Sequence, residues 1–357
     1  MRDLIFPMRR PSLLLLAGLV AAGILTSQLT ANGGAGKPTV HRRAAVATIS
    51  AVGDIAMIAN GDGGASYFAS VRRYLRGGVV LGNLEGTLTD RGASKCGSTS
   101  SSCFAFRAPP SYVSLLRNAG FDILNLANNH AYDFGTVGQS DTVAALDRLH
   151  LRHTGRPGEI GIVRVRGLRV AFLGFAPYPW AQSLTNLPAA RALVRRAAST
   201  ADLVVVMIHA GAEGSDEEHV PSSTEYFLGE NRGNSRAFAH AVVDAGADLV
   251  VGSGPHVLRG MEWYRGRLIA YSLGNFEGCH TLATSGDLGL SGVLHVTLRA
   301  DGSWIGGDLV PIRLVGCGVP ERDPAEASHG VVRELSRADF GRRGMHVSRT
   351  GVLLPPA

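Results

Sequence analysis

Lysine is almost missing from this chain of 357 residues, and the charge pattern excludes one common class of partner. Only Lys37 and Lys95 are present, so the net charge of +6 comes from arginines spread along the sequence. Nucleic-acid-binding surfaces usually carry dense basic runs with interleaved aromatic side chains. No such run occurs, and aromatic residues make up 6% of the chain. We therefore expect no nucleic-acid partner, although an arginine-rich face could meet an anionic polymer.

Cysteine is also scarce, with four residues and no Cys-x-x-Cys pair, which argues against a cysteine-based metal site. Cys96 and Cys103 flank a loop rich in Gly, Ser and Thr, whereas Cys279 and Cys317 come much later. Among the three possible pairings we predict the sequential one, 96–103 and 279–317. Disulfides persist in oxidising compartments, so this pairing favours an exported protein.

The apolar run at the N-terminus, residues 13–25, is short for a membrane span, which needs about 20 residues. It follows Arg9 and Arg10, and this basic-then-apolar order is typical of an export signal. We expect residues 1–31 to be a signal peptide or a retained membrane anchor, and residues 32–46 to be a flexible linker. The protein would then be extracellular or anchored to the outer face of the cytoplasmic membrane.

Short apolar segments and amphipathic segments alternate, which predicts an α/β fold. The predicted strands cover residues 48–52, 79–84, 121–127, 202–208 and 248–251. Helical patterns cover residues 65–76, 111–119, 139–149 and 234–245. A hairpin over 164–175 and antiparallel strands at 267–273, 292–298 and 307–314 are also expected. From about residue 321 the chain is polar and predicts a loosely packed tail.

Each of the five strands ends at a side chain that can bind a metal ion or transfer a proton. These residues are Asp54, Glu85, Asn129 with His130, His209 and His256. In α/β sheets, ligands bind outside the carboxyl ends of the strands, so we expect these side chains to converge. A single histidine of this kind is more often a satisfied core residue, but five strand ends form a pattern. Carboxylates, an amide oxygen and imidazoles together suit Zn, Mn or Fe.

The motifs around these residues resemble the CapA family, which is named for poly-γ-glutamate capsule synthesis. They are Gly53-Asp54, Asn83-Leu84-Glu85, Asn128-Asn129-His130, His209-x-Gly-x-Glu213, Gly-Pro-His256 and Tyr-Ser-Leu-Gly-Asn275-Phe276. The family belongs to the calcineurin-like metallophosphatase superfamily. The resemblance implies a β-sandwich of mixed sheets flanked by helices, with four layers in the order αββα. We expect this domain to span residues 47–316, with residues 317–357 as the tail.

The resemblance also implies a role for each matched residue. Asp54 would bind a first metal ion, Glu85 would take the bridging position, and Asn129 would bind a second ion. His209 and His256 would be the imidazole ligands, His130 the proton donor, and Glu213 and Asn275 would line the cleft. Two superfamily histidines are replaced here by Ala56 and Gly254. We therefore expect one metal ion, or one ion with a second that binds weakly, and not two complete sites.

Two functions follow from this pattern. The first is a metal-dependent hydrolase that cleaves a phosphoester or a γ-glutamyl amide bond at the cell envelope. The second is a non-catalytic component of capsule synthesis or export, which would bind an anionic chain such as poly-γ-glutamate through Arg107 and Arg259. Membrane partner proteins are compatible with either function.

Overall fold

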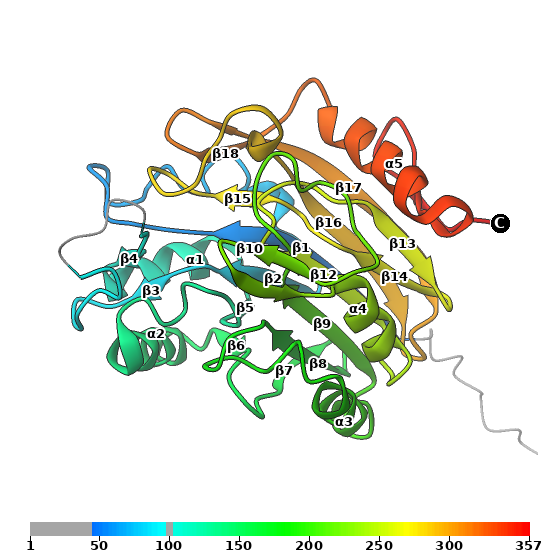
Figure 1. The fold of residues 1–357 in the computed structure, drawn as a ribbon, viewed down its shortest axis with the longest axis horizontal. Helices are drawn as coiled ribbons and strands as arrows, with labels where there is room; N and C mark the ends of the chain where they lie inside the picture. The colour runs from blue at the N-terminus through cyan, green and yellow to red at the C-terminus, as the bar shows by residue number, and fades with distance from the viewer. Residues whose placement is uncertain (1–44, 98–102) are drawn as a thin grey trace, which may run out of the picture. The chain divides into compact units, whose positions relative to one another are not determined.

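Two mixed β-sheets form the body of the protein in the computed structural model, which describes residues 45–97 and 103–357 (Figure 1). The first sheet has the order β18-β17-β16-β1-β2-β5-β6, with β15 beside β1. Its strands are β1 (Val46–Ile55), β2 (Val79–Leu84), β5 (Ile123–Asn125), β6 (Arg152–Thr154), β15 (Asn275–Glu277), β16 (Leu290–Arg299), β17 (Trp304–Val315) and β18 (Val319–Arg322). The second sheet has the order β13-β14-β12-β9-β8-β7. Its strands are β7 (Gly161–Val165), β8 (Leu168–Phe175), β9 (Leu203–His209), β12 (Leu249–Ser253), β13 (Met261–Tyr264) and β14 (Arg267–Ala270).

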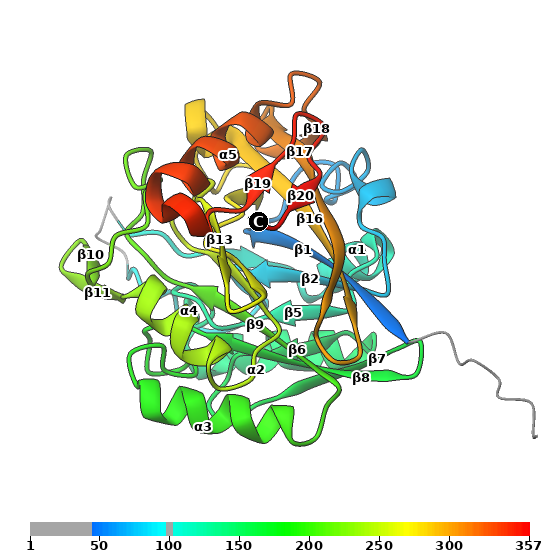
Figure 2. The same ribbon diagram turned by 90° about the vertical axis from the view of Figure 1, so that its right-hand side faces the viewer.

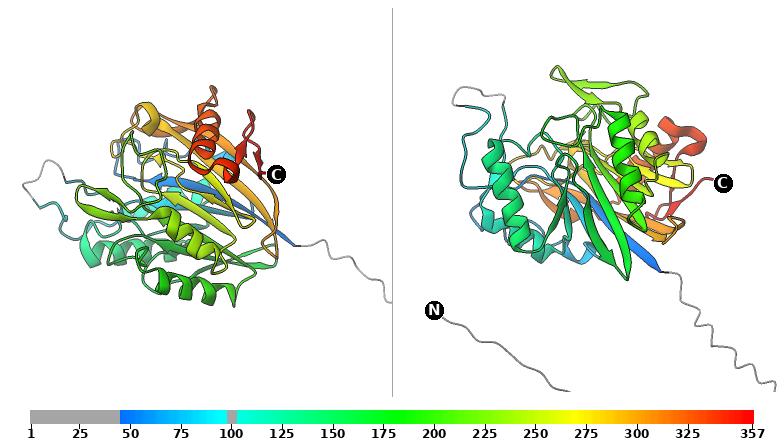
Figure 3. Two further views of the ribbon diagram at one scale, coloured as in Figure 1. Left: turned by 45° about the vertical axis from the view of Figure 1, so that its right-hand side comes forward. Right: turned by 90° about the horizontal axis from the view of Figure 1, so that it is seen from below.

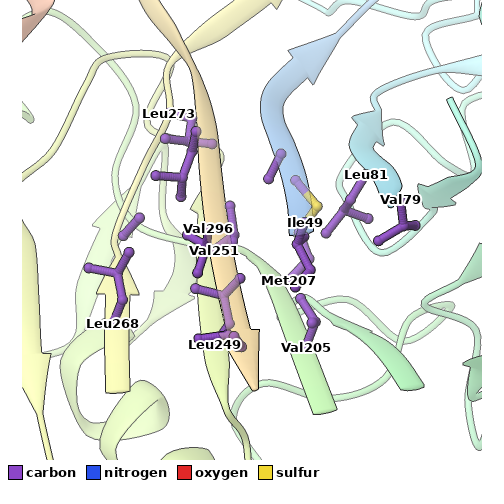
Figure 4. Close-up of a cluster of buried hydrophobic side chains, with 14 of the residues drawn as sticks. Ile49, Val79, Leu81, Val205, Met207, Leu249, Val251, Leu268, Leu273 and Val296 are labelled. Atoms are coloured by element: carbon purple, nitrogen blue, oxygen red, sulfur yellow. The ribbon is translucent and has the colours of Figure 1, made fainter. Parts of the chain in front are cut away.

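The largest hydrophobic core lies between the two sheets, as Figure 4 shows for side chains from both of them. Strand β9 contributes Val205 and Met207 to this core, whereas its alternate residues Val206 and Ile208 belong to the core beneath the helices. Side chains alternate between the two faces of a strand, so an unbroken apolar strand indicates a sheet that is covered on both faces.

Helices cover the outer face of each sheet (Figure 2, Figure 3). Helices α1 (Val113–Ala119) and α2 (Gly135–Arg148) contribute to the outer core of the first sheet. Helices α3 (Leu187–Ala198) and α4 (Ser235–Val243) cover the second sheet. This four-layer αββα arrangement confirms the predicted fold class. Apart from the elements that follow β18, the remaining ones are short: β3 (Thr87–Leu88), β4 (Arg107–Ala108), β10 (Glu225–Phe227), β11 (Glu230–Gly233), η1 (Arg72–Tyr74), η2 (Pro110–Tyr112) and η3 (Gly286–Gly289).

The prediction of an α-helix over residues 65–76 is wrong, because the backbone hydrogen bonds there are not those of an α-helix. The segment consists of successive turns followed by the 3-10 helix η1. Its backbone bonds are mostly three residues apart, as from Tyr67 N–H to Gly64 O and from Val71 N–H to Phe68 O. Tyr67, Phe68 and Val71 are nevertheless buried, so the apolar spacing identified the buried face but not the type of turn.

The expectation of a loosely packed tail after residue 317 is also wrong. The segment forms β18, helix α5 (Ala327–Phe340), η4 (Gly341–Arg343) and the paired strands β19 (His346–Val347) and β20 (Leu353–Leu354). Val332, Val347 and Leu353 are fully or almost fully buried in the core between the sheets. These apolar residues are widely spaced among polar ones, which is why the segment had no clear pattern in the sequence.

Both predicted disulfides, Cys96–Cys103 and Cys279–Cys317, are present. The second joins the loop after β15 to the turn between β17 and β18 and spans 38 residues of sequence. The predicted signal peptide or anchor and most of the predicted linker lie outside the described residues. In the described ranges, no helix has the length and apolar character needed to cross a membrane.

Glu277 is a buried acid whose ionisation should weaken the fold. One carboxylate oxygen accepts a hydrogen bond from Cys279 N–H (3.0 Å), and the other has no partner among the described residues. Burial raises the pKa of Glu277 well above its ordinary value. In the unfolded chain this glutamate loses its proton above a pKa of about 4.3, whereas in the folded protein it keeps the proton to higher pH. Between the two pKa values the free energy of unfolding therefore falls by about 1.4 kcal/mol for each pH unit.

We therefore expect Glu277→Gln to raise the melting temperature at pH 8 and to have little effect near pH 4. Thermal melts of both proteins across this range test the prediction. An equal effect at both pH values would show that the ionisation of Glu277 is not its cause.

Candidate metal centre

Residues from both sheets meet at one buried centre. Strands β1, β2 and β5 run parallel in the first sheet, and β9 and β12 run parallel in the second. The predicted site residues lie at or just after the carboxyl ends of these strands. They are Asp54 in β1, Glu85 after β2, Asn129 and His130 after β5, His209 at the end of β9, and His256 after β12.

Glu85 occupies the middle of this centre. Its Oε1 lies 3.7 Å from His209 Nε2, 3.8 Å from His256 Nε2 and 4.0 Å from His130 Nε2. Both carboxylate oxygens of Glu85 lack a hydrogen-bond partner among the described residues, as do His209 Nε2 and Asn129 Oδ1. Buried polar atoms are rarely left unpaired, because losing water without a new partner is costly. These donors are therefore arranged for a ligand.

Asp54 lies on the other side of the two imidazoles. Its Oδ1 is 3.5 Å from His209 Nδ1, and its Oδ2 is 3.4 Å from His256 Nδ1. The carboxylate also accepts hydrogen bonds from Asn83 Nδ2 (2.8 Å) and Gly254 N–H (3.1 Å). Atoms of Asp54, Glu85 and His256 lie within 4.8 Å of one another, which is close enough for one ion to contact all three.

The electrostatics of the centre separate its two buried acids. Burial raises the pKa of Glu85 well above its usual range, and the nearby charge of Asp54 adds to the effect. Burial acts in the same direction on Asp54, but contacts with His209 and His256 outweigh it and hold the pKa of Asp54 well below normal. Two carboxylates this close repel each other, and a cation between them would relieve that repulsion.

His130 is held from two sides. Its Nδ1 lies 2.7 Å from Asp133 Oδ2, and the Phe106 ring stacks on the imidazole with 4.1 Å between centroids. Because Asp133 accepts the Nδ1 proton, Nε2 faces Glu85 and the rest of the centre. Our sequence reasoning missed Asp133, although its position three residues after His130 in a turn is a usable signal.

Glu213 borders the centre and is paired with a buried arginine that we did not predict. Glu213 Oε1 lies 2.6 Å from Arg232 Nη1, and its Oε2 lies 3.6 Å from His256 Nε2. Asn129 Nδ2 donates to Glu213 Oε1 at 3.4 Å. Burial opposes ionisation, but His256 and Arg232 lower the pKa of Glu213 to about 2. Glu213 therefore carries a negative charge that orients Asn129 and His256.

The structure contradicts the predicted substrate-binding role of Arg259, whereas the roles predicted for Asn275 and Arg107 stay predictions. Arg259 is fully buried and pairs with Glu225 at 2.7 Å, so a polymer cannot reach it. Asn275 Oδ1 accepts a hydrogen bond from His256 Nδ1 (2.8 Å), and its amide donates to backbone carbonyls, so Asn275 helps to hold His256 in place. Arg107 donates to the backbone carbonyls of Arg91 and Gly92 and lies over the Phe134 ring.

Gly254 and Ala56, which replace the two superfamily histidines, lie in different surroundings. Gly254 has a φ of 110°, and a Cβ there would lie 2.9 Å from Ala210 N and 3.2 Å from the His209 ring. A histidine at this position would require the backbone to move. Ala56 is fully buried, and its N–H donates to Glu277 O at 2.8 Å. Neither position can supply a ligand.

The residues that are present fit one divalent ion. Asp54, Glu85, His209, His256 and Asn129 offer the carboxylate, imidazole and amide donors that first-row divalent metals accept. The unpaired atoms of Glu85, His209 and Asn129 are consistent with this assignment. The donor set does not by itself distinguish among Mn, Fe and Zn.

The protein is thus an αββα sandwich with a buried carboxylate–imidazole centre at the ends of its strands. The model of the bacterial capsule synthesis protein family PGA_cap matches residues 48–277. Over 306 residues the chain is 32% identical to the capsule biosynthesis protein CapA of Bacillus anthracis, covering 78% of this chain and 70% of that protein. It is 33% identical over 181 residues to the PGA biosynthesis protein CapA of Bacillus subtilis, covering 46% and 44%. The chain belongs to the bacterial capsule synthesis protein family.

Similar solved structures have low sequence identity. A phosphatase from Mycoplasma pneumoniae has a TM-score of 0.48 and 12% identity, with 80% of this chain and 97% of that chain covered. A 5'-nucleotidase precursor from Thermus thermophilus has a TM-score of 0.42 and 13% identity, with 83% and 59% covered.

Proposed function

We propose that this protein is an exported, metal-dependent hydrolase that acts in the synthesis of an anionic capsule or envelope polymer, on γ-glutamyl or phosphoester bonds. The observation that carries the proposal is the convergence of three imidazole Nε2 atoms on the unpaired carboxylate of Glu85. The capsule synthesis names of the relatives support the choice of polymer. The two disulfides and the basic-then-apolar N-terminal sequence support export.

The side chains around the centre have distinct tasks in this proposal. A divalent ion held by Asp54, Glu85, His209 and His256 would supply Lewis-acid activation. His130 is not needed as a ligand. In its protonated form, with the Nδ1 proton held by Asp133, it can give its Nε2 proton to the leaving group. Glu213 and Arg232 keep the surrounding donors in place.

Binding of an anionic polymer without catalysis is less well supported by the described residues. One of the two arginines on which that function depended is unavailable, because Arg259 pairs with Glu225 inside the protein. Arg107 donates to two backbone carbonyls of a neighbouring loop. A purely binding protein also has no need for a buried carboxylate with two unpaired oxygens.

The full chain, purified without chelator, tests the proposal. We expect cleavage of poly-γ-glutamate or of bis(p-nitrophenyl) phosphate, loss of activity after EDTA treatment, and recovery with Mn, Fe or Zn. A metal-loaded protein that cleaves neither substrate contradicts hydrolysis. If that protein retained poly-γ-glutamate at low salt after chelation, the non-catalytic function would be favoured instead.

A further inference from the structure

Lys95, one of two lysines in the chain, is attached to the segment that carries His130. Its Nζ lies 2.6 Å from Asp133 Oδ1, and it also donates to the Asn129 carbonyl at 3.4 Å. The backbone N–H of Lys95 donates to the Asp133 carbonyl at 2.8 Å. The side chain of Asp133 is fully buried, whereas that of Lys95 is 35% exposed. Lys95 therefore reaches from the surface to a buried carboxylate.

Phe106 secures the same carboxylate from the other end of the loop. Its N–H donates to Asp133 Oδ2 at 2.6 Å, the oxygen that also contacts His130 Nδ1. Its ring covers one face of the imidazole. Lys95 and Phe106 together leave Asp133 little freedom to rotate, and Asp133 in turn fixes the His130 ring.

The Cys96–Cys103 disulfide connects these two points of attachment. Cys96 directly follows Lys95, and Cys103 lies just before Phe106 in the sequence. The bond shortens the covalent path between Lys95 and Phe106, so neither contact can open widely without moving the other. A disulfide that closes a loop restricts the conformations available to the residues beside it.

We propose that Lys95, held by the Cys96–Cys103 disulfide, is a positioning residue that fixes His130 through Asp133. This inference rests on the proposed role of His130 as a proton donor. Lys95 pairs with the outer oxygen of Asp133 and so holds the carboxylate where its other oxygen contacts His130 Nδ1. Oxidising conditions would then be needed for full activity as well as for stability.

The ring-current shift of His130 tests the inference without any need for turnover. In the NMR spectrum of protein labelled at histidine, the stacked Phe106 ring shifts the proton resonances of the His130 imidazole. The resonances that disappear in the His130→Gln variant are those of His130. We expect Lys95→Met, and separately the double variant Cys96→Ser/Cys103→Ser, to move these resonances toward the position of an exposed histidine. Lys95→Arg should restore most of the shift. Unchanged His130 resonances in both Lys95→Met and the double variant would overturn the inference.

Two controls separate positioning from general destabilisation. Arg195→Met removes an exposed positive charge from α3, and Cys279→Ser/Cys317→Ser removes the other disulfide; neither should move the His130 resonances. Mild reduction of the folded wild type replaces the double variant if that variant does not fold. If the wild type hydrolyses either substrate, Lys95→Met should lower kcat about 10- to 100-fold with KM and bound metal unchanged. If the wild type hydrolyses neither substrate, the proposed function is contradicted, but the His130 resonances still show whether Lys95 fixes His130 through Asp133.

Discussion

Glu85→Gln is expected to remove the bound metal ion and, at the same time, to stabilise the metal-free protein. The carboxylate is fully buried, neither of its oxygens has a hydrogen-bond partner within residues 45–97 and 103–357, and burial and Asp54 raise its pKa. Without a cation, a neutral amide costs less to bury than this group, so we expect a gain of roughly 1 kcal/mol or more. Metal affinity should fall by more than about 100-fold, beyond the usual effect of losing a supporting residue.

Metal analysis and thermal melts, with and without chelator, measure both effects. Glu277→Gln is the matched control, because it also neutralises a fully buried glutamate but should leave metal binding intact. Retention of the metal by Glu85→Gln would show that Glu85 is not a ligand. A fall in the stability of the metal-free variant would show that the carboxylate is satisfied by contacts within the protein.

Replacement of His130 by Ala should produce the second large effect, a loss of turnover with the metal retained. A positioned general acid contributes about 10²- to 10⁴-fold to the rate, so we expect kcat to fall within this range. The fall should be smaller for a substrate with a good leaving group such as p-nitrophenolate, because that group needs less help from a proton. Metal content should stay at the wild-type value, because the other imidazoles remain.

The control for this substitution is His219→Ala, which removes an exposed histidine that pairs with Asp339. It should change neither kcat nor metal content. Loss of the metal from His130→Ala would contradict the proposed division of roles, since His130 Nε2 would then be a ligand. Steady-state kinetics on both substrates and metal analysis of the same preparations distinguish these results.

The sequence was most informative where one strong physical requirement acts on neighbouring residues. The strand that ends at His209 is an unbroken run of apolar residues, because both faces of its sheet are covered. Asp54, Glu85 and His256 each follow such a strand or a tight glycine turn, and parallel strands in α/β sheets bring these ends together. The convergence of the centre could therefore be predicted without coordinates.

Contacts between segments far apart in sequence could not be predicted in this way. Nothing local to Arg259 or Asn275 indicates that one pairs inside the protein and the other supports His256. Arg232 lies on β11, far from the strand-end motifs, and reaches Glu213 only in the folded chain. For α5, burial depends on the sheet beneath it, and its own sequence shows only a few separated apolar residues.

The candidate centre takes its donors from both sheets, with Asp54 and Glu85 from one and His209 and His256 from the other. An ion held there would therefore link the two sheets, and this link would exist only when the metal is available. Its binding free energy adds to the free energy of unfolding by mass action. Metal scarcity would then shorten the lifetime of the protein in the presence of proteases, apart from any effect on its chemistry.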